Sequence, residues 1–243
     1  MILGALVFCA TMLANAPASL IGLASGQGSP SYSNAEGTLW RGALRDVSVS
    51  GVALGDISFR LSPWSVLQLS PRLDVSSSGG AVTGRGSVTL GSGKSFLLKD
   101  VEADISLRAI APRGVFGRPA IGRAKINIKR LAFSRHTGCK AASGEVWTNV
   151  LDAPAQQFNL PALPMSGTVQ CEGEALVVAL EGENARTGAA ISLKIDKSLT
   201  YEIVATARTR EEDVASALRV FGFEDDNGDL IYGSVGVLTG AGS

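Results

Sequence analysis

The chain has 243 residues with 22 basic and 22 acidic side chains, so its formal net charge at pH 7 is zero. Because a nucleic-acid-binding surface needs clustered basic residues, this balance argues against a DNA- or RNA-binding protein. The 29 glycines, 18% charged residues and 6% aromatic residues instead favour many short strands joined by turns.

The first segment, residues 1–24, is almost entirely apolar or small, and no charged residue precedes Glu36. A helix over Met1–Ala16 would be about 24 Å long, slightly short of the ~30 Å hydrocarbon core of a bilayer, and Pro17 would stop or kink it. We therefore expect residues 1–24 to be an N-terminal membrane-anchor helix and residues 25–243 to be a separate β domain.

Two alternatives to an anchor remain for this segment. A cleavable signal peptide is one, because Ala14-Asn15-Ala16 resembles a cleavage site, although Pro17 would then directly follow the cut. A buried core helix is the other. Signal peptides and anchors usually begin with Lys or Arg, and none is present here, so we expect the natural chain to start upstream.

From residue 35 onward, apolar and polar side chains mostly alternate, which is typical of antiparallel strands with one covered and one solvated face. The apolar positions of this pattern are Val47, Val49 and Val52; Ile57, Phe59 and Leu61; Ile126 and Ile128; Ile191, Leu193 and Ile195; and Ile203, Ala205 and Ala207. Turn sequences separate the runs at Ser78-Gly79-Gly80, Gly91-Ser92-Gly93, Gly182-Glu183-Asn184 and Asp226-Asn227-Gly228. The pattern predicts an all-β fold, a curved and open antiparallel sheet with meander connections.

A short phrase recurs in which a glycine is followed two positions later by an aliphatic residue. It occurs at Gly37-Thr38-Leu39, Gly86-Ser87-Val88, Gly144-Glu145-Val146, Gly167-Thr168-Val169 and Gly233-Ser234-Val235. The phrase suggests two similar halves that meet near residue 138. The alternative is that a glycine before a strand is ordinary hairpin sequence.

The middle of the chain contains a basic stretch and two cysteines. Lys and Arg alternate with apolar residues over Arg123–Arg135, which predicts the solvated face of a strand, with an anionic partner as the alternative. Cys139 and Cys171 lack the Cys-x-x-Cys spacing of a zinc site, and His136 is the only histidine. In an oxidising compartment the two cysteines would form a disulfide; two buried free thiols are the other possibility.

The last third contains a loop, a helix and a hairpin. Proline-rich Ala153–Met165 is expected to be a crossover loop. One short helix is predicted near residues 210–221, with Thr209 and Glu212 as a capping box and Gly222 as its end. A hairpin around Asn227-Gly228 is expected to follow it.

No pattern in the chain indicates an enzyme, a metal site or a cofactor. His136 has no nucleophile elbow beside it, and Gly84-Arg85-Gly86 does not open a helix as a phosphate loop would. The acidic stretch Glu224–Asp229 lacks the glycine position and distal glutamate of a calcium loop, so a tight turn is favoured over calcium binding. Trp40, Trp64 and Trp147 are expected to be core or sheet-edge anchors rather than a carbohydrate platform.

Several phrases resemble the type II secretion system protein N family. They are Ala16-Pro17-Ala18-Ser19, Gly37–Ala43, Leu54–Phe59 with Leu61–Trp64, Cys139–Trp147, Leu163–Gly167 leading to Cys171, and Leu218–Gly236. They cover almost the whole chain, but they describe strand starts and turns and contain no catalytic signature.

This resemblance implies a non-catalytic inner-membrane protein with one N-terminal span, a periplasmic body and other secretion-system subunits as partners. Edge strands or an open sheet face would make the contacts. A lipid-binding or lipid-transfer module is the competing hypothesis, because a curved open sheet leaves an apolar face. The residues that would line that face, or else form part of the core, are Val178, Leu180, Ile191, Leu193, Ile203, Leu218 and Phe221.

Overall fold

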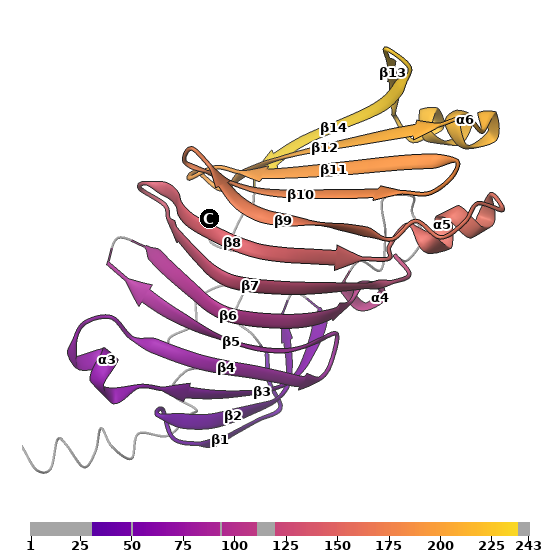
Figure 1. The fold of residues 1–243 in the computed structure, drawn as a ribbon. Coiled ribbons are helices and arrows are strands. Elements are labelled where there is room, and N and C mark those ends of the chain that lie inside the picture. The colour runs from indigo at the N-terminus through magenta and orange to yellow at the C-terminus, as the bar shows by residue number, and fades with distance from the viewer. Residues whose placement is uncertain (1–30, 50, 93, 111–119, 238–243) are drawn as a thin grey trace, which may run out of the picture.

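The computed structural model describes residues 31–49, 51–92, 94–110 and 120–237, and these form one strongly curved, open antiparallel sheet of fourteen strands (Figure 1). The strands are β1 Asn34–Gly37, β2 Arg41–Val49, β3 Val52–Leu61, β4 Arg72–Gly79, β5 Val82–Gly91, β6 Ser95–Ser106, β7 Arg123–Ser134, β8 Gly138–Thr148, β9 Met165–Glu172, β10 Ala175–Glu183, β11 Thr187–Ile195, β12 Thr200–Thr209, β13 Glu224–Asp226 and β14 Asp229–Val237. The predicted all-β, open antiparallel fold is confirmed.

Each strand from β1 to β12 lies beside the strand that precedes it in the sequence, and the order ends β12-β14-β13. All four predicted turn sequences join neighbouring strands, at the β4–β5, β5–β6, β10–β11 and β13–β14 connections. The meander is therefore confirmed. The suggestion of two halves meeting near residue 138 stays a prediction; that residue begins β8, in the middle of the strand order.

The predicted C-terminal helix is present as α6, Glu212–Val220, but its expected cap is wrong. Thr209 ends β12, and its hydroxyl accepts a hydrogen bond from the backbone N–H of Glu211, which is the N-cap residue. Gly222 does end the helix: with φ +90° its N–H donates to the Arg219 carbonyl, and the next N–H, of Phe223, donates to Leu218. This pair of bonds satisfies the last carbonyl groups of the helix.

Three further helices were not predicted: α3 Pro63–Leu67, α4 Leu107–Ile110 and α5 Asp152–Gln157. Because α5 lies in the connection between paired strands β8 and β9, the predicted crossover loop over Ala153–Met165 is wrong. No helix within the described ranges is long and apolar enough to span a bilayer. The predicted anchor at residues 1–24 lies outside the described residues.

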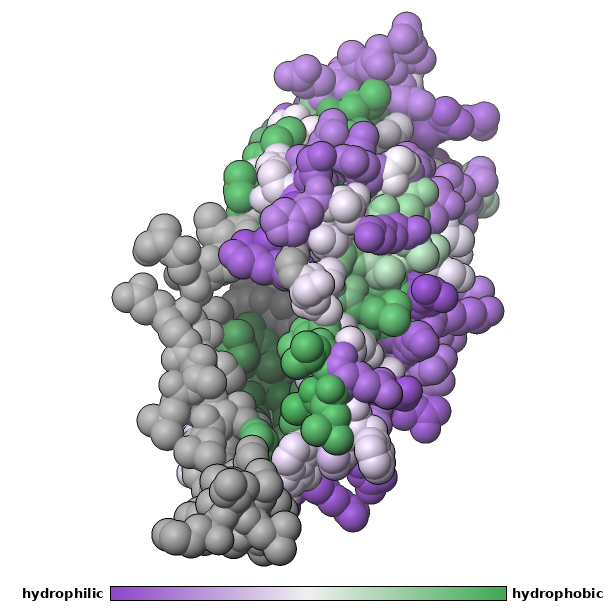
Figure 2. Space-filling view, turned by 90° about the vertical axis from the view of Figure 1, so that its left-hand side faces the viewer, coloured by the Kyte–Doolittle hydropathy of each residue, from purple (hydrophilic) through white to green (hydrophobic). Residues whose placement is uncertain are grey.

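The register places apolar side chains on one face of the sheet and polar side chains on the other. We call the first the apolar face, defined by partnered residues that include Ile57, Val75, Leu98, Leu131, Val169, Val178, Leu193 and Ile203. The opposite, polar face carries ion pairs between neighbouring strands, such as Arg85 with Glu102 and Arg123 with Asp104. In Figure 2 the apolar residues gather along a hollow on one side of the sheet, and hydrophilic residues cover the other side.

Two of the β-bulges that interrupt the alternation lie at aspartates. Asp46 and Asp100 adopt positive φ angles of 51°, and the pairing shifts around them. The shift brings Leu44 and Val47, three residues apart, into one buried cluster with Phe59. A bulge adds a residue to one strand and bends it, so these positions help to curve the sheet.

A side chain would be obstructed at four of the five glycines of the recurring phrase: Gly37, at the end of β1, and three glycines in the interior of the sheet. Gly86, Gly144 and Gly167 lie within strands on the apolar face, and a Cβ atom added at any of them would clash with the adjacent strand. The aliphatic residue two positions later shares the face because side chains alternate along a strand. In these copies the phrase marks a close approach of two strands and not the start of a hairpin.

Candidate interaction surfaces

His136 and Cys139, the two side chains considered for catalysis, are both placed by the structure. His136 lies in the tight connection between β7 and β8, where its backbone N–H donates to the Ser134 hydroxyl. Cys139, its nearest possible nucleophilic partner, is joined to Cys171. Within the described ranges no three His, Cys, Asp or Glu side chains gather where a metal ion could be held.

The acidic stretch forms the β13–β14 hairpin, and its carboxylates bind arginines. Asn227 and Gly228 have φ angles of 51° and 94°, as a two-residue type I′ turn requires. Asp225 accepts two hydrogen bonds from Arg219, at 2.8 and 3.1 Å, and Asp229 accepts two from Arg208, at 2.7 and 2.8 Å. The arginine hydrogen bonds lower the pKa of both carboxyl groups. Their oxygens serve ion pairs, and the favoured tight turn is the one observed.

The tryptophans differ from the expected anchors. Trp64 lies on the short helix α3 with 75% of its surface exposed, so the prediction is wrong for this residue. Trp147 lies on the polar face, where the Lys125 ammonium group sits 5.7 Å from the centre of its ring. This contact joins neighbouring strands β7 and β8.

Five of the seven residues expected to line an apolar face are brought together. Val178 pairs with Leu193, Leu180 pairs with Ile191, and Leu193 pairs in turn with Ile203, so all five occupy one patch across β10, β11 and β12. We call these five residues the C-terminal apolar patch; each is half-buried.

The two helix residues do not join the C-terminal apolar patch. Leu218 packs in two clusters where α5 and α6 meet the end of the sheet, one with Ala155 and Val214 and one with Ala207 and Leu230. Phe221 caps α6 with 42% of its surface exposed.

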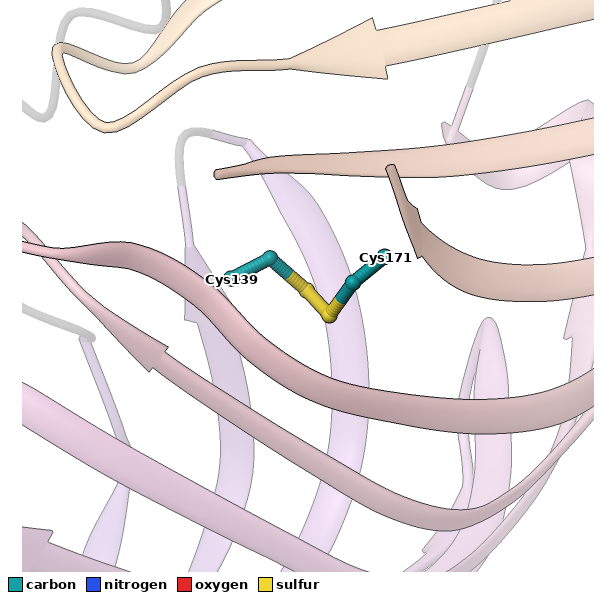
Figure 3. Close-up of a disulfide and its surroundings, with 2 residues drawn as sticks. All are labelled: Cys139 and Cys171. Atoms are coloured by element: carbon teal, nitrogen blue, oxygen red, sulfur yellow. A yellow bond between two sulfur atoms is a disulfide. The ribbon is translucent and has the colours of Figure 1, made fainter. Parts of the chain in front are cut away.

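A disulfide joins β8 to β9 where their ladder of hydrogen bonds ends (Figure 3). The two strands pair from Ser143–Gln170 to Thr148–Met165, and beyond Ser143 the start of β8 separates from β9. Cys139 and Cys171 bridge this gap with Cα atoms 5.6 Å apart, and the Cys139 N–H donates to the Glu174 carbonyl at 2.7 Å. The bond thus attaches the start of β8 to the β9–β10 hairpin.

The two edges of the sheet differ in length and charge. At one edge β1 has four residues, and its Glu36 pairs with Arg45. At the other edge β13 covers only Asp229–Ile231 of β14. In the described part of the chain no strand pairs with the outer side of Gly233–Val237, whose inner side pairs with β12. That second edge was not predicted. The uncharged run over Leu230–Val237 was the available signal, because natural edge strands usually carry charged residues or proline.

The comparisons with known proteins identify a family. Residues 31–230 match the family model described as type II secretion system (T2SS), protein N. The matched region contains the described sheet from β1 into β14. No curated protein and no solved structure matches the chain.

Proposed function

The chain belongs to the type II secretion system protein N family, and on this premise we propose that it is a non-catalytic accessory subunit anchored in the inner membrane. The observation that carries the proposal is the family match over residues 31–230. Membership makes the chain a component of the secretion system, with other components as partners. The sheet supplies two surfaces for such contacts: an apolar face and an uncovered strand edge.

The proposed location follows from the charge distribution. Residues 1–24 contain no charged side chain, whereas the chain as a whole carries 44. An uncharged apolar segment partitions into a bilayer, and a strongly charged domain does not. We infer that the N-terminus is cytoplasmic and that the body lies in the periplasm, an oxidising compartment in which a Cys139–Cys171 disulfide is chemically stable.

We expect a reporter that is active only in the periplasm, fused after Ser243, to be active, and the membrane-bound protein to resist extraction by high salt. Replacing Leu6 and Val7 with lysine should abolish both properties, because each charge at a helix centre costs about 2.5–3.5 kcal/mol on the insertion scale. The matched control replaces Ser31 and Ser33, beyond the apolar segment, with lysine and should change neither. A cytoplasmic reporter signal from the native sequence would contradict the location and the secretion role together.

The C-terminal apolar patch favours a second candidate function, binding of lipid acyl chains. Its five aliphatic side chains are contiguous across three strands, and each keeps part of its surface accessible. A contiguous apolar surface on a soluble domain is typical of a partner or ligand site.

For this second candidate we expect lipid to co-purify with residues 25–243 expressed without detergent and to be detected by mass spectrometry. Leu193→Lys, which puts a charge in the C-terminal apolar patch, should remove most of the bound lipid. Ser192→Lys, which adds the same charge on the polar face of the same strand, should not. Equal lipid content in both variants, or none in the unaltered protein, would rule this candidate out.

A further inference from the structure

The open edge of β14 is uncharged and apolar where it is uncovered. Between Leu230 and Val237 the sequence holds no charged residue and no proline. Val235 and Val237 are 69% and 58% exposed. An edge with these properties is a template for another strand, because its outward backbone donors and acceptors have no partner among the described strands.

The hairpin fixes which backbone groups point outward from this edge. Asp226 and Asp229 flank the two-residue turn and therefore form a hydrogen-bonded pair. Outward-pointing residues alternate along a strand. The N–H and C=O groups of Ile231 thus face β13, and those of Gly233, Val235 and Val237 face the open side.

We propose that this edge pairs with the same edge of a second copy of the chain, antiparallel and centred on Val235. In that register Val235 lies opposite Val235 of the second copy, and Gly233 lies opposite Val237. All three are outward-pointing positions, so each forms a hydrogen-bonded pair across the two-fold axis, six bonds in total by the antiparallel pattern.

The side chains fit this register as well as the backbone does. Opposite each Val237 lies Gly233, at which even a Cβ atom would meet nothing within 4 Å in the monomer. The two Val235 side chains lie side by side and cover each other. No like charges meet, because the paired segment Gly233–Val237 has none.

The other edge of the sheet is the poorer partner. β1 has only four residues, and Glu36 with its bound Arg45 lies at that end. Pairing β14 of one copy with β1 of the next would moreover be a head-to-tail contact, which builds a ring or an open-ended chain of molecules, whereas pairing β14 with itself closes after two copies. The dimer does not depend on the secretion role, since it follows from the edge geometry alone.

The test uses the full chain in mild detergent, with Cys9→Ser to remove the one cysteine outside the disulfide. A hydrogen-bonded antiparallel pair separates Cα atoms by about 5.5 Å, within the range that a disulfide bridges. We expect Val235→Cys to form a covalent dimer under mild oxidation. Val237→Cys, displaced from the two-fold axis, should form none by itself, and a mixture of Val237→Cys with Gly233→Cys should form the heterodimer.

Solution mass gives an independent readout. Light scattering should show the unaltered chain as a dimer at high concentration, and Val235→Lys should raise the dissociation constant at least tenfold, because like charges directly opposite are unfavourable. Ser192→Lys, with the same added charge two strands inward, should leave it unchanged. Equal cross-linking of the Val235 and Val237 variants overturns the register. A monomer up to roughly 100 µM overturns the dimer, since an interface of this small size is of the weak class, as does cross-linking only to a different protein.

Discussion

Replacing Cys139 and Cys171 together with alanine should lower the free energy of unfolding by about 3.7 kcal/mol, the chain-entropy value for a cross-link between residues 32 apart. For a protein of this size that loss corresponds to a decrease in Tm of roughly 7–15 °C. The bond also attaches the start of β8 to the β9–β10 hairpin, where the strand ladder has ended. Thermal unfolding of the oxidised protein with and without the two substitutions measures the effect.

Two controls separate the cross-link from the loss of sulfur atoms. Reducing the unaltered protein should reproduce most of the decrease in Tm, whereas adding reductant to the double alanine variant should change nothing. Thiol labelling under denaturing, non-reducing conditions reports the bond in the exported protein. Complete labelling of both cysteines there would contradict our prediction that the bond forms after export.

Gly167→Ala should destabilise the protein by about 3 kcal/mol, the upper part of the usual range for overpacking. The added Cβ atom would clash with the carbonyl oxygen of Ala179 and would lie 2.8 Å from the Cα atom of Leu180. Because both are backbone atoms of β10, relief requires the strand itself to move. Urea unfolding monitored by circular dichroism measures the change.

Gly188→Ala is the matched control for this substitution. Gly188 also lies within a strand, β11, but an added Cβ atom there would meet nothing within 4 Å, and its φ angle is not positive. Its replacement should be neutral or stabilising by about 0.4–1 kcal/mol, because alanine restricts the unfolded chain. Similar losses for the two variants would show that close strand approach is not what requires the glycine at residue 167.

The strands were predictable because side chains alternate between the two faces of a sheet, and the same alternation is visible in the sequence. Where a face is covered, side chains must alternate, so the sequence alone showed that Ile191, Leu193 and Ile195 share one face of β11. The turn at Asn227-Gly228 could be predicted equally well, since the two positive φ angles of a type I′ turn favour the Asn-Gly pair.

The features that were missed are those in which the local sequence is ambiguous. A five-residue helix such as α3 is too short to show a 3.6-residue period, and Trp64 within it was therefore placed wrongly. The bulges at Asp46 and Asp100 break the alternation that strand prediction relies on. Thr209 satisfied the capping pattern, but strand pairing in β12 extended over it.

The same distinction applies to the candidate surfaces: some could be predicted from local sequence patterns, and others depended on long-range packing or strand pairing. The C-terminal apolar patch could be listed in advance because its five residues alternate within strands and neighbouring strands align them. The place of Leu218 depended on how α6 meets α5 across about 60 residues of sequence, and no local pattern carries that information. The open edge of β14 depended on how short β13 is, which again is a property of pairing and not of composition.

The order of the strands has a consequence for how the molecule folds. Since each strand from β2 to β12 pairs with the one before it, the chain closes only the connection between two consecutive strands at each step, and the contacts are local for a β protein. The longest of these connections are residues 107–122 and 149–164. The sheet can grow from β1 as the chain emerges, without any strand inserting between two already paired. Every partly grown sheet then ends in an uncovered edge, which the next strand of the same chain must reach before a strand of another molecule does.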